Sequence, residues 1–260
     1  MAAVSIPVEI HGEIAKHVEL KRDLVSYLAT SRLILGEVER ELYRSITLKG
    51  YDAVTLDELL DGLLSNAHRC SLVHQFQFQS DVRPSTMHIR KLEVAFGSMI
   101  NLTHLHLGVK DLSIAEVAMS CTFRLTHLSC SGQSRDVGLA PFLASQPSLR
   151  RVDIPRIFAI EGLPSKSLPN LSTLTGTADV VNAILPGRSV ERLHWASQIT
   201  PARFGPISDL DPGPPFLTLR ALKASGALRQ LNLPQTCPNL RLLEFPGPVL
   251  FFRVSSILSV

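Results

Sequence analysis

A six-residue pattern of apolar positions, Leu-x-x-Leu-x-apolar, returns along most of the chain. One copy reads Leu102-Thr103-His104-Leu105-His106-Leu107, and the others span 73–78, 125–130, 149–154, 171–176, 190–195, 219–224 and 240–245. The first positions of successive copies lie 19 to 29 residues apart. Within each copy apolar and polar residues alternate, as in a β-strand with one buried face. The pattern therefore predicts a series of short strands at a nearly regular spacing.

The segments between these strands carry signals for helix starts. Candidate N-caps are Thr55, Ser113, Asp136 and Asp179, which would begin helices over about 56–64, 114–121, 137–145 and 180–185. The stretches 158–169 and 201–215 show no helix signal, and the second is rich in proline. Units of this period are too small to bury their own apolar faces, so they stack on one another. We expect an α/β solenoid with parallel strands on the concave face and helices and loops outside.

The first 45 residues differ in kind, because their apolar residues follow a helical spacing. After Pro7, which suits the first turn of a helix, one apolar stripe is formed by Ile10, Ile14 and Val18. A second short helix, with Asp23 as its N-cap, would carry Leu24 and Leu28, and a third would run from about Leu33 to Tyr43. A bundle of this size needs a partner or the adjacent array to hold together. A strand is expected from Ser45 to Leu48.

Composition narrows the class of protein. With 45% hydrophobic and 19% charged residues, disorder is excluded over most of the length. The net charge of +3 comes without a Lys/Arg block or interleaved aromatic residues, so we expect no nucleic-acid partner. The four cysteines are scattered, as in the core of a reduced intracellular protein: Cys70, Cys121, Cys130 and Cys237.

Neither end of the chain predicts a membrane segment. Glu9, His11 and Glu13 fall where a signal peptide would be apolar. The apolar tail over 249–260 contains Arg253 and is shorter than the about 20 residues that a bilayer span needs. We therefore expect a cytoplasmic or nuclear protein. Since the tail has no helix signal and no polar cap, we also expect the array to end without a terminal unit, as in a truncated receptor.

Motifs of catalysis and cofactor binding are missing from the sequence. It has no G-x-S-x-G, no H-E-x-x-H and no glycine-rich phosphate loop, so we expect no enzyme and no cofactor. Three histidines on neighbouring strands could converge on zinc: His104, His106 and His127. We do not predict a metal site, because no cysteine pair or nearby carboxylate supports them. Trp195 takes an inward position and is expected to pack in the core.

The third and fifth residues of each copy should point away from the core. This outward set comprises Gln75, Gln77, His104, His106, His127, Ser129, Arg151, Asp153, Thr173, Thr175, Arg192, His194, Ala221, Lys223, Leu242 and Glu244. The surface would be polar and mixed in charge, which suits recognition of a peptide or a folded protein. The alternative is that these positions are simply solvated.

The N-terminal module resembles an F-box. The resemblance rests on Ile6-Pro7-Val8-Glu9-Ile10, then Ile14 and Val18, then Asp23-Leu24, and finally Leu42-Tyr43-Arg44-Ser45-Ile46. F-boxes followed by irregular leucine-rich repeats occur together in fungal proteins, and phrases such as Cys237-Pro238-Asn239-Leu240-Arg241-Leu242-Leu243 look like such repeats. The resemblance implies an F-box-like module over 1–46, a leucine-rich-repeat solenoid over 47–248, and the apolar tail over 249–260.

The same resemblance implies the substrate receptor of a Skp–cullin–F-box ubiquitin ligase. The residues expected to bind a Skp-type adaptor are Ile6, Pro7, Glu9, Ile10, Ile14, Leu24 and Leu28. Those expected to bind the target protein are Gln75, Gln77, His104, His106, His127, Arg151, Asp153, Arg192, His194, Lys223 and Glu244. The alternative is a non-catalytic repeat scaffold whose N-terminal helices only cap the solenoid. The two differ in whether the stripe of Ile6, Ile10 and Ile14 is exposed or packed on the repeats.

Overall fold

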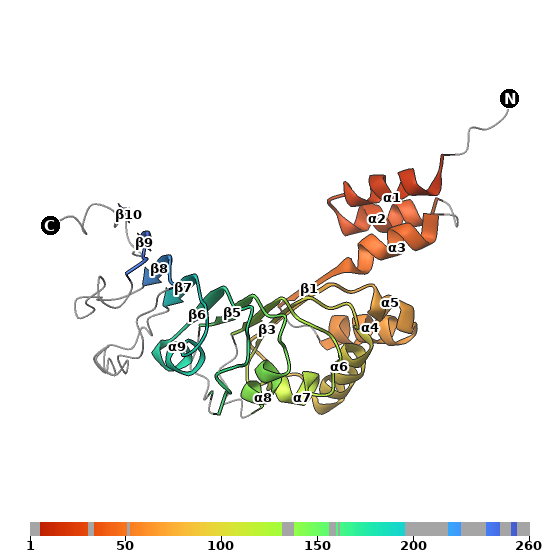
Figure 1. Cartoon of the computed structure of the whole chain (residues 1–260). Coiled ribbons are helices and arrows are strands. Elements are labelled where there is room, and N and C mark those ends of the chain that lie inside the picture. Colours follow the sequence, from red (N-terminus) through yellow and green to blue (C-terminus); the bar gives the residue numbers. More distant parts are fainter. Residues whose placement is uncertain are drawn as a thin grey trace.

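A nine-stranded parallel sheet forms the centre of the molecule (Figure 1). The computed structural model describes residues 6–30, 34–50, 53–131, 138–155, 160, 162–195, 218–224, 238–244 and 251–253. The parallel strands pair in chain order: β1 (Ser45–Lys49), β2 (Gln75–Ser80), β3 (His104–Val109), β4 (His127–Cys130), β5 (Arg151–Ile154), β6 (Thr173–Gly176), β7 (Arg192–Trp195), β8 (Ala221–Ala224) and β9 (Leu242–Glu244). The sheet is open, and the predicted α/β class is confirmed.

The repeated pattern forms strands because its apolar positions share one face. Phe76 and Phe78 in β2, and Leu105 and Leu107 in β3, all point into one continuous apolar core. The first residue of each copy, such as Leu102, is buried just before its strand begins. The alternation therefore predicts both the strands and their buried face correctly.

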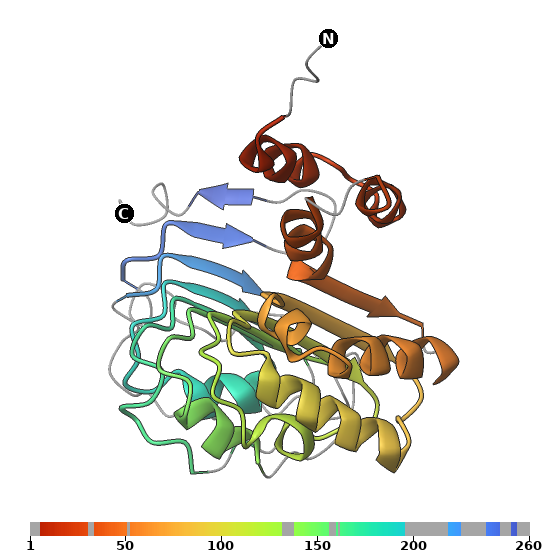
Figure 2. The same cartoon turned by 90° about the vertical axis from the view of Figure 1, so that its right-hand side faces the viewer.

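Helices and turns cover the face of the sheet that carries the apolar core (Figures 1 and 2). They leave the opposite face uncovered, and we call it the open face. The helices on the covered face are α4 (Ala53–Leu64), α5 (Ala67–Ser71), α6 (Thr86–Ser98), α7 (Ile114–Ala118), α8 (Leu139–Ala144) and α9 (Ala178–Ile184). Neither α5 nor α6 is expected from the sequence. Helix α6 lies in the 29-residue interval between the copies that begin at Val73 and Leu102. Phe96 of α6 packs edge-on against Phe76 and Phe123, with ring centroids 5.1 and 6.4 Å apart.

Several predicted helix starts are displaced in the structure. Ser113 caps α7 as expected, its side chain accepting the N–H of Ala115. Thr55 lies inside α4, which begins at Ala53, and Asp179 lies in the first turn of α9, whose N-cap is Thr177. Both displaced residues are still favourable there, because polar and acidic side chains suit the first turn of a helix. Asp136 lies outside the described residues.

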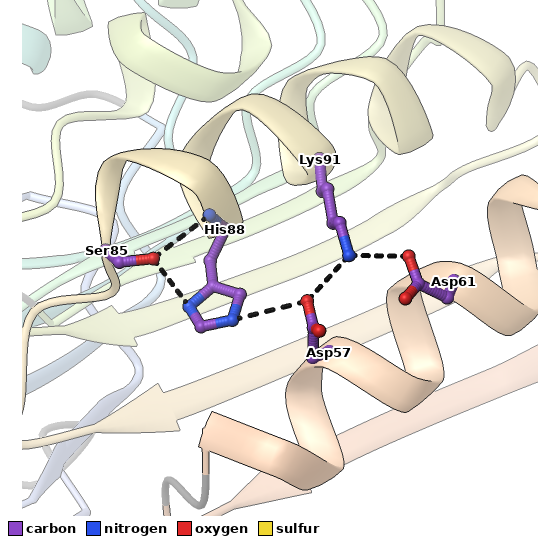
Figure 3. Close-up of polar contacts among 5 residues, drawn as sticks. All are labelled: Asp57, Asp61, Ser85, His88 and Lys91. Atoms are coloured by element: carbon purple, nitrogen blue, oxygen red, sulfur yellow. Dashed lines mark hydrogen bonds and ion pairs between the residues drawn. The ribbon is translucent and has the colours of Figure 1, made fainter.

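Five polar residues hold α4 and α6 together (Figure 3). The Lys91 amine donates to Asp57 and Asp61 at 2.6 Å each, which lowers the pKa of Asp57 and raises that of Lys91. The buried His88 ring lies between the Ser85 hydroxyl at 3.0 Å and the Asp57 carboxylate at 3.5 Å. The Ser85 oxygen also accepts the backbone N–H of His88 and so caps α6. We assign this network to joining the two helices.

The N-terminal residues form a small bundle of three helices at the β1 end of the sheet (Figure 1). They are α1 (Val8–Lys16), α2 (Lys21–Leu28) and α3 (Leu35–Arg44). The second begins after Leu20, so Asp23 lies in its first turn and is not its N-cap. The bundle has its own core, separate from that of the sheet, formed by Ala15, Leu24, Ile34 and Val38.

Three contacts attach this bundle to the sheet. Helix α3 runs directly into β1 at Ser45, and the Lys21 amine donates to the backbone oxygens of Leu42 and Ser45. Arg69 of α5 lies 3.3 Å from the Glu39 carboxylate and stacks 5.5 Å from the centre of the Tyr43 ring. The attachment is therefore made through α3 and, by way of Lys21, through α2, while α1 contributes none of these contacts.

Residues 251–253 of the C-terminal tail return to the sheet. Strand β10 (Phe251–Arg253) pairs antiparallel with β9, placing Phe252 opposite Leu243. This antiparallel strand is not expected from the sequence, whereas the expectation that the array ends without a polar terminal unit stays a prediction, because most of the tail lies outside the described residues. The predicted proline-rich loop over 201–215 lies outside the described residues. Of the other stretch without a helix signal, 158–169, the described residues 160 and 162–169 contain no helix, as expected.

Candidate functional site

Two rows of side chains cross the open face of the sheet. The parallel register aligns equivalent positions of neighbouring strands, so each row holds one residue from every strand β1–β9. The first row is Ser45, Gln75, His104, His127, Arg151, Thr173, Arg192, Ala221 and Leu242. The second row is Thr47, Gln77, His106, Ser129, Asp153, Thr175, His194, Lys223 and Glu244. Every predicted target-binding residue lies in one of these rows.

The outward positions of the pattern are exposed or half-buried, with one exception. Thr175 is only 6% exposed. It stands between the larger side chains of Asp153 and His194 in the second row, which explains why a short threonine is covered there. The structure thus brings the predicted target-binding residues together on one surface, which no helix of the described sheet region covers (Figure 1).

His104 and His127 stack in the first row. Their ring centroids are 4.2 Å apart and the planes differ by 9°. Each Nδ1 lies 2.9 Å from the hydroxyl of the preceding residue, Thr103 or Thr126, and each hydroxyl donates to a backbone oxygen. Since a hydroxyl has one proton, we assign the Nδ1–H tautomer to both rings. Burial lowers the pKa of both histidines, and the neutral rings leave their Nε2 atoms as hydrogen-bond acceptors.

The second row contains a half-buried carboxylate, Asp153. Burial raises its pKa, and the opposing effects of Arg151, His194 and His106 are smaller. His106 accepts a hydrogen bond on Nε2 from the Gln79 amide at 2.8 Å if its proton is on Nδ1, and burial lowers its pKa. The middle of the open face is therefore polar but poorly hydrated, which favours a partner that supplies its own hydrogen-bonding groups.

Cationic side chains gather on the half of the sheet formed by β5–β9. Arg151 and Arg192 are exposed in the first row, and Lys223 in the second row lies 3.6 Å from Glu244. Three further arginines are not expected from the sequence to take part: Arg150, Arg220 and Arg241. They immediately precede β5, β8 and β9, so they lie at the edge of the sheet where the parallel strands begin. Comparing the second residues of the repeated phrases would reveal them, because these copies begin Leu149-Arg150, Leu219-Arg220 and Leu240-Arg241.

A second surface lies on the N-terminal bundle. Ile6, Ile10 and Ile14 are 50%, 49% and 42% exposed. We call these three residues the apolar N-terminal surface. Helix α1 turns its opposite side inward, where Gly12 lets it approach α3 so closely that an added Cβ would lie 3.0 Å from the Glu37 carboxylate.

The predicted adaptor-binding residues divide between surface and core. Pro7 and Glu9 are exposed beside the apolar N-terminal surface. Leu24 is only 4% exposed and Leu28 packs against the same small core. Leu24 therefore stabilises the bundle, and its assignment as a surface contact is wrong, because α2 turns this residue inward.

Neither a metal-binding cluster nor a membrane-spanning helix occurs among the described residues. No group of three or more His, Cys, Asp or Glu side chains in that part of the chain is arranged to hold a metal ion. His104 and His127 stack face to face and do not converge with His106 on a common point. No helix within the described ranges is long and apolar enough to cross a membrane. Cys70 and Cys130 are buried and Cys121 is half-buried, where desolvation raises the pKa of its thiol to about 11.

No protein-family model matches the chain, and no curated protein matches it.

Proposed function

We propose that this chain is the substrate-recognition subunit of a Skp–cullin–F-box ubiquitin ligase, acting in the cytoplasm or the nucleus. In this proposal residues 1–46 form an F-box-like module that binds a Skp-type adaptor, and through it a cullin. Residues 47–248 form an irregular leucine-rich-repeat solenoid whose open face binds the target protein. The chain itself performs no catalysis and uses no cofactor.

One observation carries the proposal, namely the exposure of the apolar N-terminal surface. A helix that only caps an array would turn its apolar stripe onto the neighbouring unit. Here Ile10 and Ile14 point to solvent, although the bundle already has a core of its own. Exposed apolar side chains grouped on one helix are typical of a site for another protein.

A second candidate function rests on the attachment of α3. Arg69 contacts both Glu39 and Tyr43, and these contacts tie the bundle to the first helices of the sheet. Such a contact would serve a non-catalytic scaffold in which the N-terminal helices only cap the repeats. This alternative gives the exposed Ile6, Ile10 and Ile14 no role, so we favour the receptor.

Co-expression with a Skp-type adaptor tests the proposal. The wild-type chain should purify as a complex, and Ile10→Asp should weaken it at least about a hundredfold, because the complex would bury an unpaired carboxylate. Val94→Asp is the matched control, since Val94 is a similarly exposed apolar residue on a different helix, α6. A wild-type chain that forms no complex, or equal losses from the two substitutions, would contradict the adaptor-binding role.

A further inference from the structure

The arginine side chains at the β5–β9 half of the sheet make no ion pair or hydrogen bond with the described residues. Arg150, Arg151, Arg192, Arg220 and Arg241 are all exposed. None of their guanidinium groups makes an ion pair or side-chain hydrogen bond with a described residue. By contrast, Arg124 and Arg188, at other positions, donate to backbone oxygens. The five arginines are therefore available to an external ligand.

Acidic side chains offset this charge only in part. Three carboxylates lie in the same area, namely Asp153, Glu191 and Glu244, and the last of these pairs with Lys223. The β2–β4 half of the same face has glutamine, histidine and serine in the two rows and no arginine. The arginines of this face are thus confined to the β5–β9 half, while Lys49 of β1 is exposed at the opposite end of the sheet.

The identity of these residues indicates a carboxylate ligand on a peptide. A guanidinium group forms two parallel hydrogen bonds with a carboxylate, which lysine cannot do. The large aromatic side chains that best stack on the bases of a single-stranded nucleic acid are Phe, Tyr and Trp, and the two rows contain none of these. The intervening Asp153 and Glu191 would also repel a continuous phosphate backbone.

Spacing adds a further constraint. Arg151 and Arg192 occupy the same row with one strand between them, which places their backbones about 10 Å apart. In a polyproline II conformation, which repeats every three residues, residues three apart point the same way and are separated by about 9 Å. A peptide that crosses the strands with an acidic residue at every third position would reach both arginines.

We propose that the β5–β9 half of the open face binds an extended acidic segment of the target protein, with Arg151 and Arg192 each holding a carboxylate. This inference rests on the proposed function, because it names the chemistry of the target. Arg150, Arg220 and Arg241 at the edge attract the acidic segment and favour its approach.

Fluorescence anisotropy with the full chain tests this proposal. The probe is a labelled peptide of four Glu-Gly-Ser repeats, and the comparison peptide replaces each Glu by Gln. We expect binding of the Glu peptide only, weakened at least about tenfold by Arg151→Gln with Arg192→Gln. The matched control, Arg90→Gln with Lys166→Gln, changes the net charge equally at exposed positions outside the two rows and should leave binding unchanged.

Each remaining outcome bears on the proposal in a defined way. Equal weakening by the control pair, or equal binding of the Gln peptide, would overturn it. Tighter binding of a single-stranded oligonucleotide, or of the Gln peptide with phosphorylated serines, would overturn the carboxylate assignment. Adaptor binding is measured in parallel: Ile10→Asp should bind the Glu peptide normally, and the double arginine variant should still bind the adaptor. Failure of the receptor proposal is thereby distinguished from failure of the acidic-peptide proposal.

Discussion

The Lys91 amine lies 2.6 Å from carboxylate oxygens of both Asp57 and Asp61, so one cation joins two positions of α4 to α6. The lowered pKa of Asp57 means that its contribution to stability is present above the ordinary pKa of about 4 and is lost as the pH falls through the folded-state value. The raised pKa of Lys91 means that its contribution is present below about pH 10 and is lost as the pH rises further. The cluster is therefore fully effective between about pH 5 and pH 9.

Replacing Lys91 tests this reading. Lys91→Ala should lower the melting temperature by a few degrees at neutral pH, because α4 and α6 lose their shared cation. The difference from wild type should shrink below about pH 4 and disappear as the pH falls through the lowered pKa of Asp57, where its carboxylate becomes protonated. Thermal unfolding followed by circular dichroism across this pH range measures both effects. Arg90→Ala, at an exposed position of the same helix, is the control, and an equal loss from it would refute a specific role for the cluster.

Neighbouring residues of one strand should differ sharply in their effect on stability. Both residues belong to β7: the Leu193 side chain is buried in the core, whereas the Arg192 side chain is exposed on the open face. Leu193→Ala should cost about 2–5 kcal/mol in the free energy of unfolding, because it leaves a cavity between strands. Arg192→Ala should change that free energy by less than about 0.5 kcal/mol. Urea unfolding of the two variants gives the comparison, and equal losses would mean that the two faces of the strand are reversed.

At the scale of elements, the strands could be predicted well and the helices less well. Copies such as Leu102 to Leu107 predict both a strand and its buried face, because the alternation of apolar and polar residues is a local property of the sequence. Thr55 and Asp179 are predicted as N-caps but lie inside the first turns of their helices. The sequence does not separate the two positions, since the same polar residues are favourable at the N-cap and in the first turn. Helix α6 went unpredicted because its cap, Ser85, is followed by His88 and not by the acidic residue of a capping box.

At the scale of the whole molecule, the open face could be predicted, but two features could not. The alternation predicts which residues share a face, and the parallel register then aligns them into rows. Whether Leu24 faces the core or a partner depends on how three helices pack, which their individual stripes do not determine. The return of β10 onto β9 likewise depends on a long-range pairing with no local signal.

The central claim is that the chain offers an adaptor one surface and a target another. Hydrogen–deuterium exchange of the full chain, with and without a purified Skp-type adaptor, tests it most directly. We expect slower exchange in residues 6–20 when the adaptor is present, because binding covers the exposed side of α1 and suppresses its local opening. Exchange in β3–β7 should stay unchanged, since the open face remains available to the target. Unchanged exchange in residues 6–20, or protection confined to the strands, would contradict the account.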